Sequence, residues 1–285
     1  MGAGQLRIFE PAERGPAENM AMDEALFLSL IHGGAPPFIR FYRWAPPTLS
    51  FGYFQKIERL LNQELAKKSG LGIVRRASGG KMVFHADEWT FSLAMPGTLL
   101  EKANPKGDFL RNFQSLMEPL VNGLQQLGLN AELRADTTKA STDRIHCYSA
   151  NVGHSVFLGD RKLIGAAGVA KEGSVLIHGS IPISLPPVLP DVFFHGVNSE
   201  TSLGMACLSE RLSPTRIAEI PAHLTQSFGQ AFSLELAFEP LSSLETQVLQ
   251  ELARKKYADV FWSQQGVAPM HVQIKNLFLV SRGKD

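Results

Sequence analysis

Short β-type segments, each bounded by turn residues, dominate the first two thirds of the chain and limit it to folds built around β-sheet. They occur at residues 37–42, 48–53, 72–76, 81–85, 89–94, 155–158, 162–167 and 174–183. Segments of this length that are rich in branched and aromatic residues and bounded by turn residues predict strands. The chain is therefore expected to be rich in sheet.

Segments with helical periodicity lie before, between and after these strands. Residues 19–31 (NMAMDEALFLSLI) carry apolar side chains at helical spacing and are followed by His32, Gly33 and Gly34, which predicts an amphipathic helix packed on a sheet. Further helices are predicted at 57–68, 109–127, 214–232 and 241–256. Helices and strands are thus expected in one chain.

The length of 285 residues is compatible with one large domain. We expect a single domain over 1–285, with 240–285 as a candidate small C-terminal extension. The proline-rich segment 185–191 (LPPVLPD) predicts a loop across one face, and an apolar alternation at 271–280 predicts a last strand-like segment.

Charge and cysteine content exclude several classes of protein. The net charge is +1, from 28 Lys and Arg against 27 Asp and Glu, which gives no reason to expect nucleic acid as a partner. Two cysteines, Cys147 and Cys207, are too few for a disulfide framework. Since no segment approaches a membrane-spanning length, we expect a soluble, cytoplasmic protein with no membrane partner.

The segment RRASGGK at 75–81 is the first candidate site, because a strand end runs into a glycine turn there. Gly79 and Gly80 allow backbone to approach a ligand closely, and the flanking cations suit an anionic group such as a phosphate or a pantetheine arm. By itself the segment fits an ordinary β-turn with solvated basic side chains better. His85, considered alone, likewise fits a structural histidine.

The segment GDRKLIGAA at 159–167 predicts a hairpin turn that leads into an apolar strand carrying Lys162. A lysine that enters a buried strand can present a fixed cation to developing negative charge. A lysine that extends its ammonium from the strand end to water is an equally good interpretation.

Cys147 lies fifteen positions before Lys162, in IHCYS. A free cysteine is more often a small core residue than a nucleophile, unless a nearby cation stabilises its thiolate. Lys162 is a candidate for that cation. Cys207 lies among apolar neighbours in GMACL and is predicted to be a core residue.

The order of these features resembles the biotin/lipoate protein ligase superfamily, and in particular its cysteine-dependent octanoyl and lipoyl transferases. AENMAMDEAL at 17–26 is similar to the family's first helix, and PTLSFGYFQ at 47–55 to its next strand. VRRASGGKMVFHADEWTFS at 74–92 is similar to its RR-x-(T/S)-G-G segment and following histidine. Residues 159–165, with HGS at 178–180, are similar to the stretch of the essential lysine, and KYADVFW at 256–262 is similar to its KY-x-x-x-x-W signature.

The resemblance implies a mixed α/β catalytic domain of the class II aminoacyl-tRNA-synthetase/biotin-ligase type, with β-sheets flanked by helices and the site at their junction. Ligases of this family use ATP and Mg²⁺ to activate a free acid as an acyl-adenylate, whereas the transferases pass the acyl group of a thioester through a cysteine. Transferases of this type have a cysteine and an aromatic residue where Cys147 and Tyr148 lie. The acidic residue of many ligases is replaced here by His154 and Ser155. Both observations favour transfer without a required cofactor.

The resemblance therefore implies transfer of an octanoyl or lipoyl group from an acyl carrier protein to a lysine of a lipoyl-carrier domain, as in 2-oxoacid dehydrogenases or the glycine cleavage H protein. Cys147 and Lys162 are the implied catalytic residues, and no metal ligand is expected. The implied substrate-binding residues are Arg75, Arg76, Ser78, Gly79, Gly80, Lys81, His85, Gly165, Ala166 and His178.

Two departures from the family pattern keep alternatives open. Residues 165–170 (GAAGVA) lack the usual Gly-x-Ala-Gln and basic residue, and 149–153 (SANVG) match the family poorly after the cysteine. The alternatives are an ATP-dependent lipoate ligase, a transferase that moves acyl groups between carrier proteins, and a non-catalytic binder of acylated carrier domains.

Overall fold

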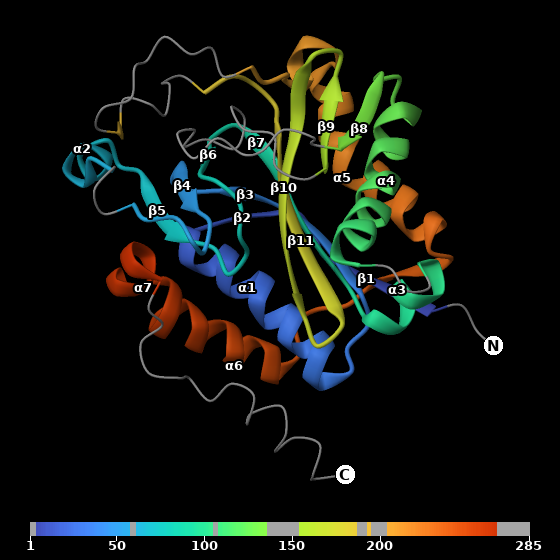
Figure 1. Ribbon diagram of the computed structural model, residues 1–285, viewed down its shortest axis with the longest axis horizontal. Coiled ribbons are helices and arrows are strands. Elements are labelled where there is room, and N and C mark those ends of the chain that lie inside the picture. The colour runs from blue at the N-terminus through green and yellow to red at the C-terminus, as the bar shows by residue number, and fades with distance from the viewer. Residues whose placement is uncertain are drawn as a thin grey trace.

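The computed structural model of the chain describes residues 4–57, 61–104, 108–135, 154–186, 193–194 and 204–266. In these residues a nine-stranded sheet forms the centre of the molecule, with the order β12-β1-β3-β7-β11-β10-β9-β8 and β2 paired to β3 (Figure 1). Its strands are β1 (Gly4–Ile8), β2 (Ala12–Arg14), β3 (Phe38–Trp44), β7 (Glu88–Met95), β8 (Ala131–Ala135), β9 (His154–Leu158), β10 (Arg161–Lys171), β11 (Ser174–Pro182) and β12 (Leu234–Phe238).

A second, smaller sheet lies beside it. Its order is β5-β4-β6, made of β4 (Thr48–Phe51), β5 (Gly72–Arg75) and β6 (Val83–His85). The helix predicted at 57–68 is shorter in the structure: α2 (Gln63–Lys68) begins after Asn62, because the Asn62 side chain accepts a hydrogen bond from the Leu65 N–H at 3.0 Å and caps the helix there.

The two faces of the large sheet differ in chemistry because successive side chains of a strand point to opposite faces. Two rows of paired residues on one face are polar, Arg40–Ser92–His178 and Tyr42–Thr90–Ser180, and they end on β10 at Ala167 and Gly165. The row between them, Phe41–Phe91–Gly179, belongs to the other face. One face can therefore hold a core and the other a site.

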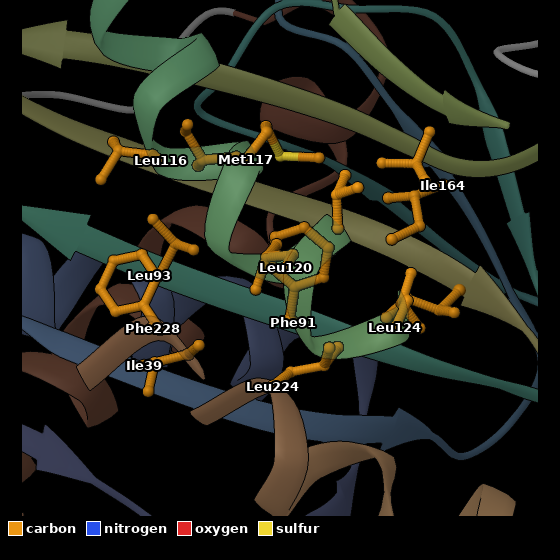
Figure 2. Packing of buried hydrophobic residues seen from close by; sticks show 14 of the residues in the cluster. Ile39, Phe91, Leu93, Leu116, Met117, Leu120, Leu124, Ile164, Leu224 and Phe228 are labelled. Atoms are coloured by element: carbon orange, nitrogen blue, oxygen red, sulfur yellow. The ribbon is translucent and has the colours of Figure 1, made fainter. Parts of the chain in front are cut away.

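The apolar face is covered by α4 (Phe109–Gln126) and α5 (Pro214–Ala231), which confirms the helices predicted in these two regions. Figure 2 shows how leucines of both helices interlock with Phe91 and Leu93 of the sheet. The helices approach closely at Gly123, where a Cβ atom would lie 2.8 Å from the Leu224 side chain. This cluster is the main core of the molecule.

The polar face is covered by α1 (Pro16–Leu28), and α1 is covered in turn by α6 (Ser243–Leu252) and η4 (Ala253–Tyr257) (Figure 1). Lys256 Nζ and Tyr257 Oη both donate to the carboxylate of Glu24 on α1, at 2.8 and 2.7 Å. The last described helix, α7 (Val260–Gln265), packs on β5. Residues 243–266 of the predicted extension thus contact both α1 and the small sheet.

Several elements carry no clear local signal and were not predicted: β1, β2, β8, β12, α3 (Gly97–Ala103) and α7. The predicted segment at 271–280 and most of the proline-rich segment 185–191 lie outside the described residues. Among the helices that the structure describes, none is both long and apolar enough to cross a membrane.

Candidate functional site

A mostly apolar pocket lies where the small sheet meets the polar face of the large sheet. Six of the ten predicted substrate-binding residues line it. The lining residues are Met20, Tyr42, Trp44, Ser50, Arg76, Lys81, Val83, His85, Thr90, Gly165, Ala166, Ala167, His178, Gly179 and Ser180. The structure therefore brings together three segments that are far apart in sequence: the turn at 76–81, β10 and β11.

Glycines permit the close backbone contacts that shape this pocket. Gly80 has a φ of +88°, and a Cβ atom there would lie 3.0 Å from Ala167 Cβ. A Cβ atom at Gly52 would lie only 2.0 Å from the Gly80 carbonyl oxygen. The turn at 76–81 is thus held between β4 and β10, and residue 52 must lack a side chain.

The neighbouring arginines at the start of the turn have different surroundings. The Arg76 guanidinium faces the pocket and donates to the Ser50 carbonyl oxygen at 2.9 Å and to Ser50 Oγ at 2.7 Å. Its other nitrogen donates to the carbonyl oxygens of Gly79 and Lys81, at 3.1 and 2.9 Å, and so holds the turn closed.

Arg75, in contrast, donates to carbonyl oxygens on the opposite side. Its acceptors are Gly52, Tyr53 and Gln55 in the segment after β4, and Trp262 and Gln264 in α7. The side chain is 1% exposed and is absent from the pocket lining. Arg75 therefore ties α7 to the loop beside the pocket.

A first Ser-His-carboxylate series joins the two sheets. Ser50 Oγ lies 2.6 Å from His85 Nε2, and His85 Nδ1 lies 2.6 Å from Glu88 Oε1. Trp44 stacks on the His85 ring, with 4.2 Å between ring centroids. His85 is thus held by both ring nitrogens and by Trp44 on one ring face, while it also lines the pocket.

A second series lies deeper, between the turn and α1. Ser78 Oγ is hydrogen-bonded to His178 Nε2, and His178 Nδ1 lies 3.4 Å from Asp23 Oδ2. Asp23 also accepts from Arg40 Nη1 at 2.7 Å and from Tyr42 Oη at 3.0 Å. Burial lowers the pKa of His178 below its usual value, although Asp23 opposes this shift. Burial and the Asp23 carboxylate raise the pKa of Tyr42.

The electrostatic balance of the pocket favours a negative group. The described residues that line it include the cations Arg76 and Lys81 but no carboxylate. Glu88 and Asp23 lie behind the lining, bound to the two histidines. A substrate oxygen that gains negative charge during a reaction would be stabilised by such a site.

Of the two predicted catalytic residues, Lys162 is among the residues that the structure describes and Cys147 is not. Lys162 is 2% exposed near the start of β10, where its backbone pairs with Gly204 and Ala206 at 3.2 and 2.8 Å. Cys147 lies outside the described residues.

Cys207 is 1% exposed, and burial raises its thiol pKa to about 11, which confirms the predicted core role. No cluster of potential metal ligands occurs in the part of the chain that the structure describes.

Sequence reasoning missed several polar residues of the site, notably Ser50, Glu88 and Asp23. Asp23 had a usable signal, because Asn19 and Asp23 are polar residues four positions apart in the apolar helix predicted at 19–31 and so lie on one helix face. Glu88 had a weaker one, as a carboxylate three residues after His85 at the start of an apolar strand.

The protein-family model of the lipoyl protein ligase A/B catalytic domain matches residues 15–229 of the chain. The octanoyltransferase LipM of Moorella thermoacetica is 32% identical over 280 residues, which cover 92% of this chain and 98% of that protein. The octanoyltransferase LipM of Geobacillus kaustophilus is also 32% identical, over 87% of this chain and 94% of that protein.

Solved structures show the same fold at lower identity. A lipoate-protein ligase A bound with ATP matches with a TM-score of 0.72 at 24% identity, over 93% of this chain and 100% of that one. A bipartite lipoate protein ligase of Thermoplasma acidophilum, from a study of the ligase and its E2 lipoyl domain, matches with a TM-score of 0.70 at 24% identity, over 95% and 100%. The predicted mixed α/β fold with sheets flanked by helices is confirmed. The chain belongs to the lipoyl protein ligase A/B catalytic domain family.

Proposed function

We propose that this chain is an octanoyltransferase of protein lipoylation, which moves an octanoyl group from an acyl carrier protein thioester to a lysine of a lipoyl-carrier domain. The observation that carries the proposal is its similarity to octanoyltransferases named LipM over nearly the full length of both chains. The pocket supports it, because an apolar lining and nearby cations suit a fatty acyl thioester.

The pocket offers separate surroundings for the two ends of the acyl group. Met20, Trp44 and Val83 provide apolar surface for the methylene chain. Arg76 lies at the turn with Ser50 beside it, and its guanidinium holds a fixed positive charge there that suits a carbonyl oxygen gaining negative charge. We place the thioester carbonyl toward this turn.

The covalent steps of the proposal use Cys147, on the sequence evidence. The Cys147 thiolate attacks the thioester carbonyl, the bond from that carbon to the carrier's sulfur breaks, and the carrier leaves as a thiolate that takes up a proton. The neutral amine of the acceptor lysine then attacks the acyl-cysteine, an amide forms, and the cysteine thiolate is released as the amine loses its proton. Lys162 would stabilise the thiolate and the oxyanion.

An ATP-dependent lipoate ligase is the second candidate, since a structural neighbour is a lipoate-protein ligase A bound with ATP. In that case free acid would be activated as an adenylate, and Cys147 would take no part. The acceptor would be the same kind of domain, as the study of the Thermoplasma ligase with its E2 lipoyl domain illustrates for that protein.

The test is transfer between purified proteins. Octanoyl acyl carrier protein, the enzyme and a lipoyl domain are mixed without ATP or Mg²⁺, and the intact mass of the lipoyl domain is measured. We expect the mass to rise by one octanoyl group, and no rise when the acceptor lysine is replaced by arginine. A rise that requires free octanoate and ATP, with none from the thioester, would establish the ligase instead.

A further inference from the structure

We infer that Glu88 is a positioning residue for acyl transfer, which fixes the Arg76 guanidinium in the pocket through His85 and Ser50. The inference rests on the proposed function and adds to it a residue with no assigned role. Glu88 itself does not line the pocket.

Glu88 is a fully engaged buried carboxylate. It is 3% exposed and accepts hydrogen bonds from His85 Nδ1, Thr90 Oγ1 and Ser180 Oγ. Thr90 Oγ1 in turn accepts from Trp44 Nε1 at 2.7 Å, and the same Trp44 ring stacks on His85. A buried carboxylate is costly unless it is hydrogen-bonded in this way, so the geometry around Glu88 is tightly defined.

The direction of each hydrogen bond follows from the chemistry of the two ends of the series, Arg76 and Glu88. A guanidinium can only donate, so Ser50 Oγ accepts from Arg76 at 2.7 Å. The ionised Glu88 carboxylate can only accept, so His85 donates to it from Nδ1; in the neutral ring this leaves Nε2 unprotonated, and Ser50 donates its single hydrogen there. His85 therefore carries its proton on Nδ1 and donates it to Glu88.

This order makes Glu88 the fixed end of the series and the turn at 76–81 its other end. The second nitrogen of Arg76 holds the carbonyl oxygens of Gly79 and Lys81. Removing the carboxylate would release His85 to rotate or change tautomer, and Ser50 and Arg76 would then lose their common geometry. Small displacements of groups that orient a substrate lower the rate of the chemical step more than they weaken binding.

The test compares three variants. Glu88→Ala removes the anchor, and Glu88→Gln keeps an amide oxygen for His85 and an amide N–H for Ser180. Glu245→Ala is the matched control, because Glu245 is 2% exposed and bound to Arg7 at 2.6 Å, and neither residue lines the pocket.

In octanoyl transfer, we expect Glu88→Ala to lower kcat by about 100-fold with KM changed less than about threefold. Glu88→Gln and Glu245→Ala should stay within about threefold of the wild type, measured below their melting temperatures. Wild-type kcat in Glu88→Ala, or a loss in Glu245→Ala as large as in Glu88→Ala, would overturn the inference.

A second readout does not depend on activity. Nitrogen NMR of ¹⁵N-histidine-labelled protein reports the tautomer of each ring, and the His85 signal is assigned from its loss in His85→Gln. We expect the Nδ1–H tautomer in the wild type and in Glu88→Gln, and its loss in Glu88→Ala.

The two readouts separate the possible failures. If Glu88→Gln keeps the tautomer but loses activity as Glu88→Ala does, the charge of Glu88 and not its positioning matters, and the inference is wrong. If the wild type transfers no octanoyl group, the proposed function fails. An Nε2–H tautomer of His85 in the wild type would then refute the hydrogen-bond order as well.

Discussion

Gly52 and Gly80 meet backbone to backbone, so that a Cβ atom on Gly52 would lie 2.0 Å from the Gly80 carbonyl oxygen. This contact holds the turn at 76–81 against the end of β4. Gly80 has a positive φ, and a Cβ atom there would lie 3.0 Å from Ala167 Cβ on β10. Two chain segments with no side chains between them can therefore approach this closely beside the pocket.

Gly52→Ala should therefore destabilise the protein strongly. The added methyl group meets backbone that cannot rotate away, and we expect a loss of about 3 kcal/mol in the free energy of unfolding, the upper end of the usual cost of overpacking. Gly79→Ala is the control in the same turn, because a Cβ atom there meets nothing within 4 Å. It should change stability by less than about 0.5 kcal/mol. Equal urea midpoints for both variants would show that the contact is not tight.

A second prediction concerns acyl chain length, since an apolar pocket measures the chain by the methylenes that it removes from water. At about 0.8 kcal/mol per methylene, a hexanoyl donor should bind about 1.6 kcal/mol more weakly than octanoyl, or ~15-fold. The measurement is kcat/KM for transfer from the two acyl carrier protein thioesters. Equal values would mean that the slot does not select length.

His178 gives a pH prediction with a definite sign. Because burial lowers its folded-state pKa below the unfolded value, the unfolded chain binds the proton first as the pH falls. Stability from this residue is complete above the unfolded pKa of about 6.5 and is lost as the pH falls from there toward the folded pKa.

His178→Gln should therefore lose less stability than the wild type between about pH 7.5 and about pH 5, measured by urea unfolding. His223→Gln on α5 is the control, because its side chain is 36% exposed and lies away from the pocket. If His178→Gln and the wild type show the same pH dependence, burial of His178 has no effect on its titration.

The polar residues show how far sequence could lead to this site. Adjacent residues of an extended chain point in opposite directions, so Arg75 and Arg76 could not both face one pocket. The sequence pattern did not tell which of them would. Glu88 is harder to predict, because its partner Ser180 meets it only through the pairing of β7 with β11.

The elements of the fold also differ in how well the sequence predicts them. The long helices α4 and α5 follow from local periodicity, because an apolar stripe must be buried whatever it packs on. Strands β1 and β12 pair in parallel although they are separated by most of the chain, and β12 is largely exposed at the sheet edge. Nothing local to either segment specifies that pairing.

Lys162 should matter through its charge. We expect Lys162→Ala to lose transfer, and the rate at which a small alkylating reagent modifies Cys147 at neutral pH to fall about tenfold, because less of the thiol is ionised. Lys171→Ala is the control, since Lys171 lies exposed at the far end of the same strand. An unchanged alkylation rate in Lys162→Ala would show that Lys162 does not stabilise the Cys147 thiolate.

The most direct test of the covalent mechanism is intact-mass analysis of the enzyme after mixing with octanoyl acyl carrier protein in the absence of an acceptor. We predict one octanoyl group on the wild type, sensitive to hydroxylamine, and the same adduct on Cys207→Ser, whose buried thiol has a pKa of about 11. Cys147→Ser should show no such adduct and almost no transfer. Wild-type transfer by Cys147→Ser, or an acyl group that maps to another residue, would contradict the mechanism.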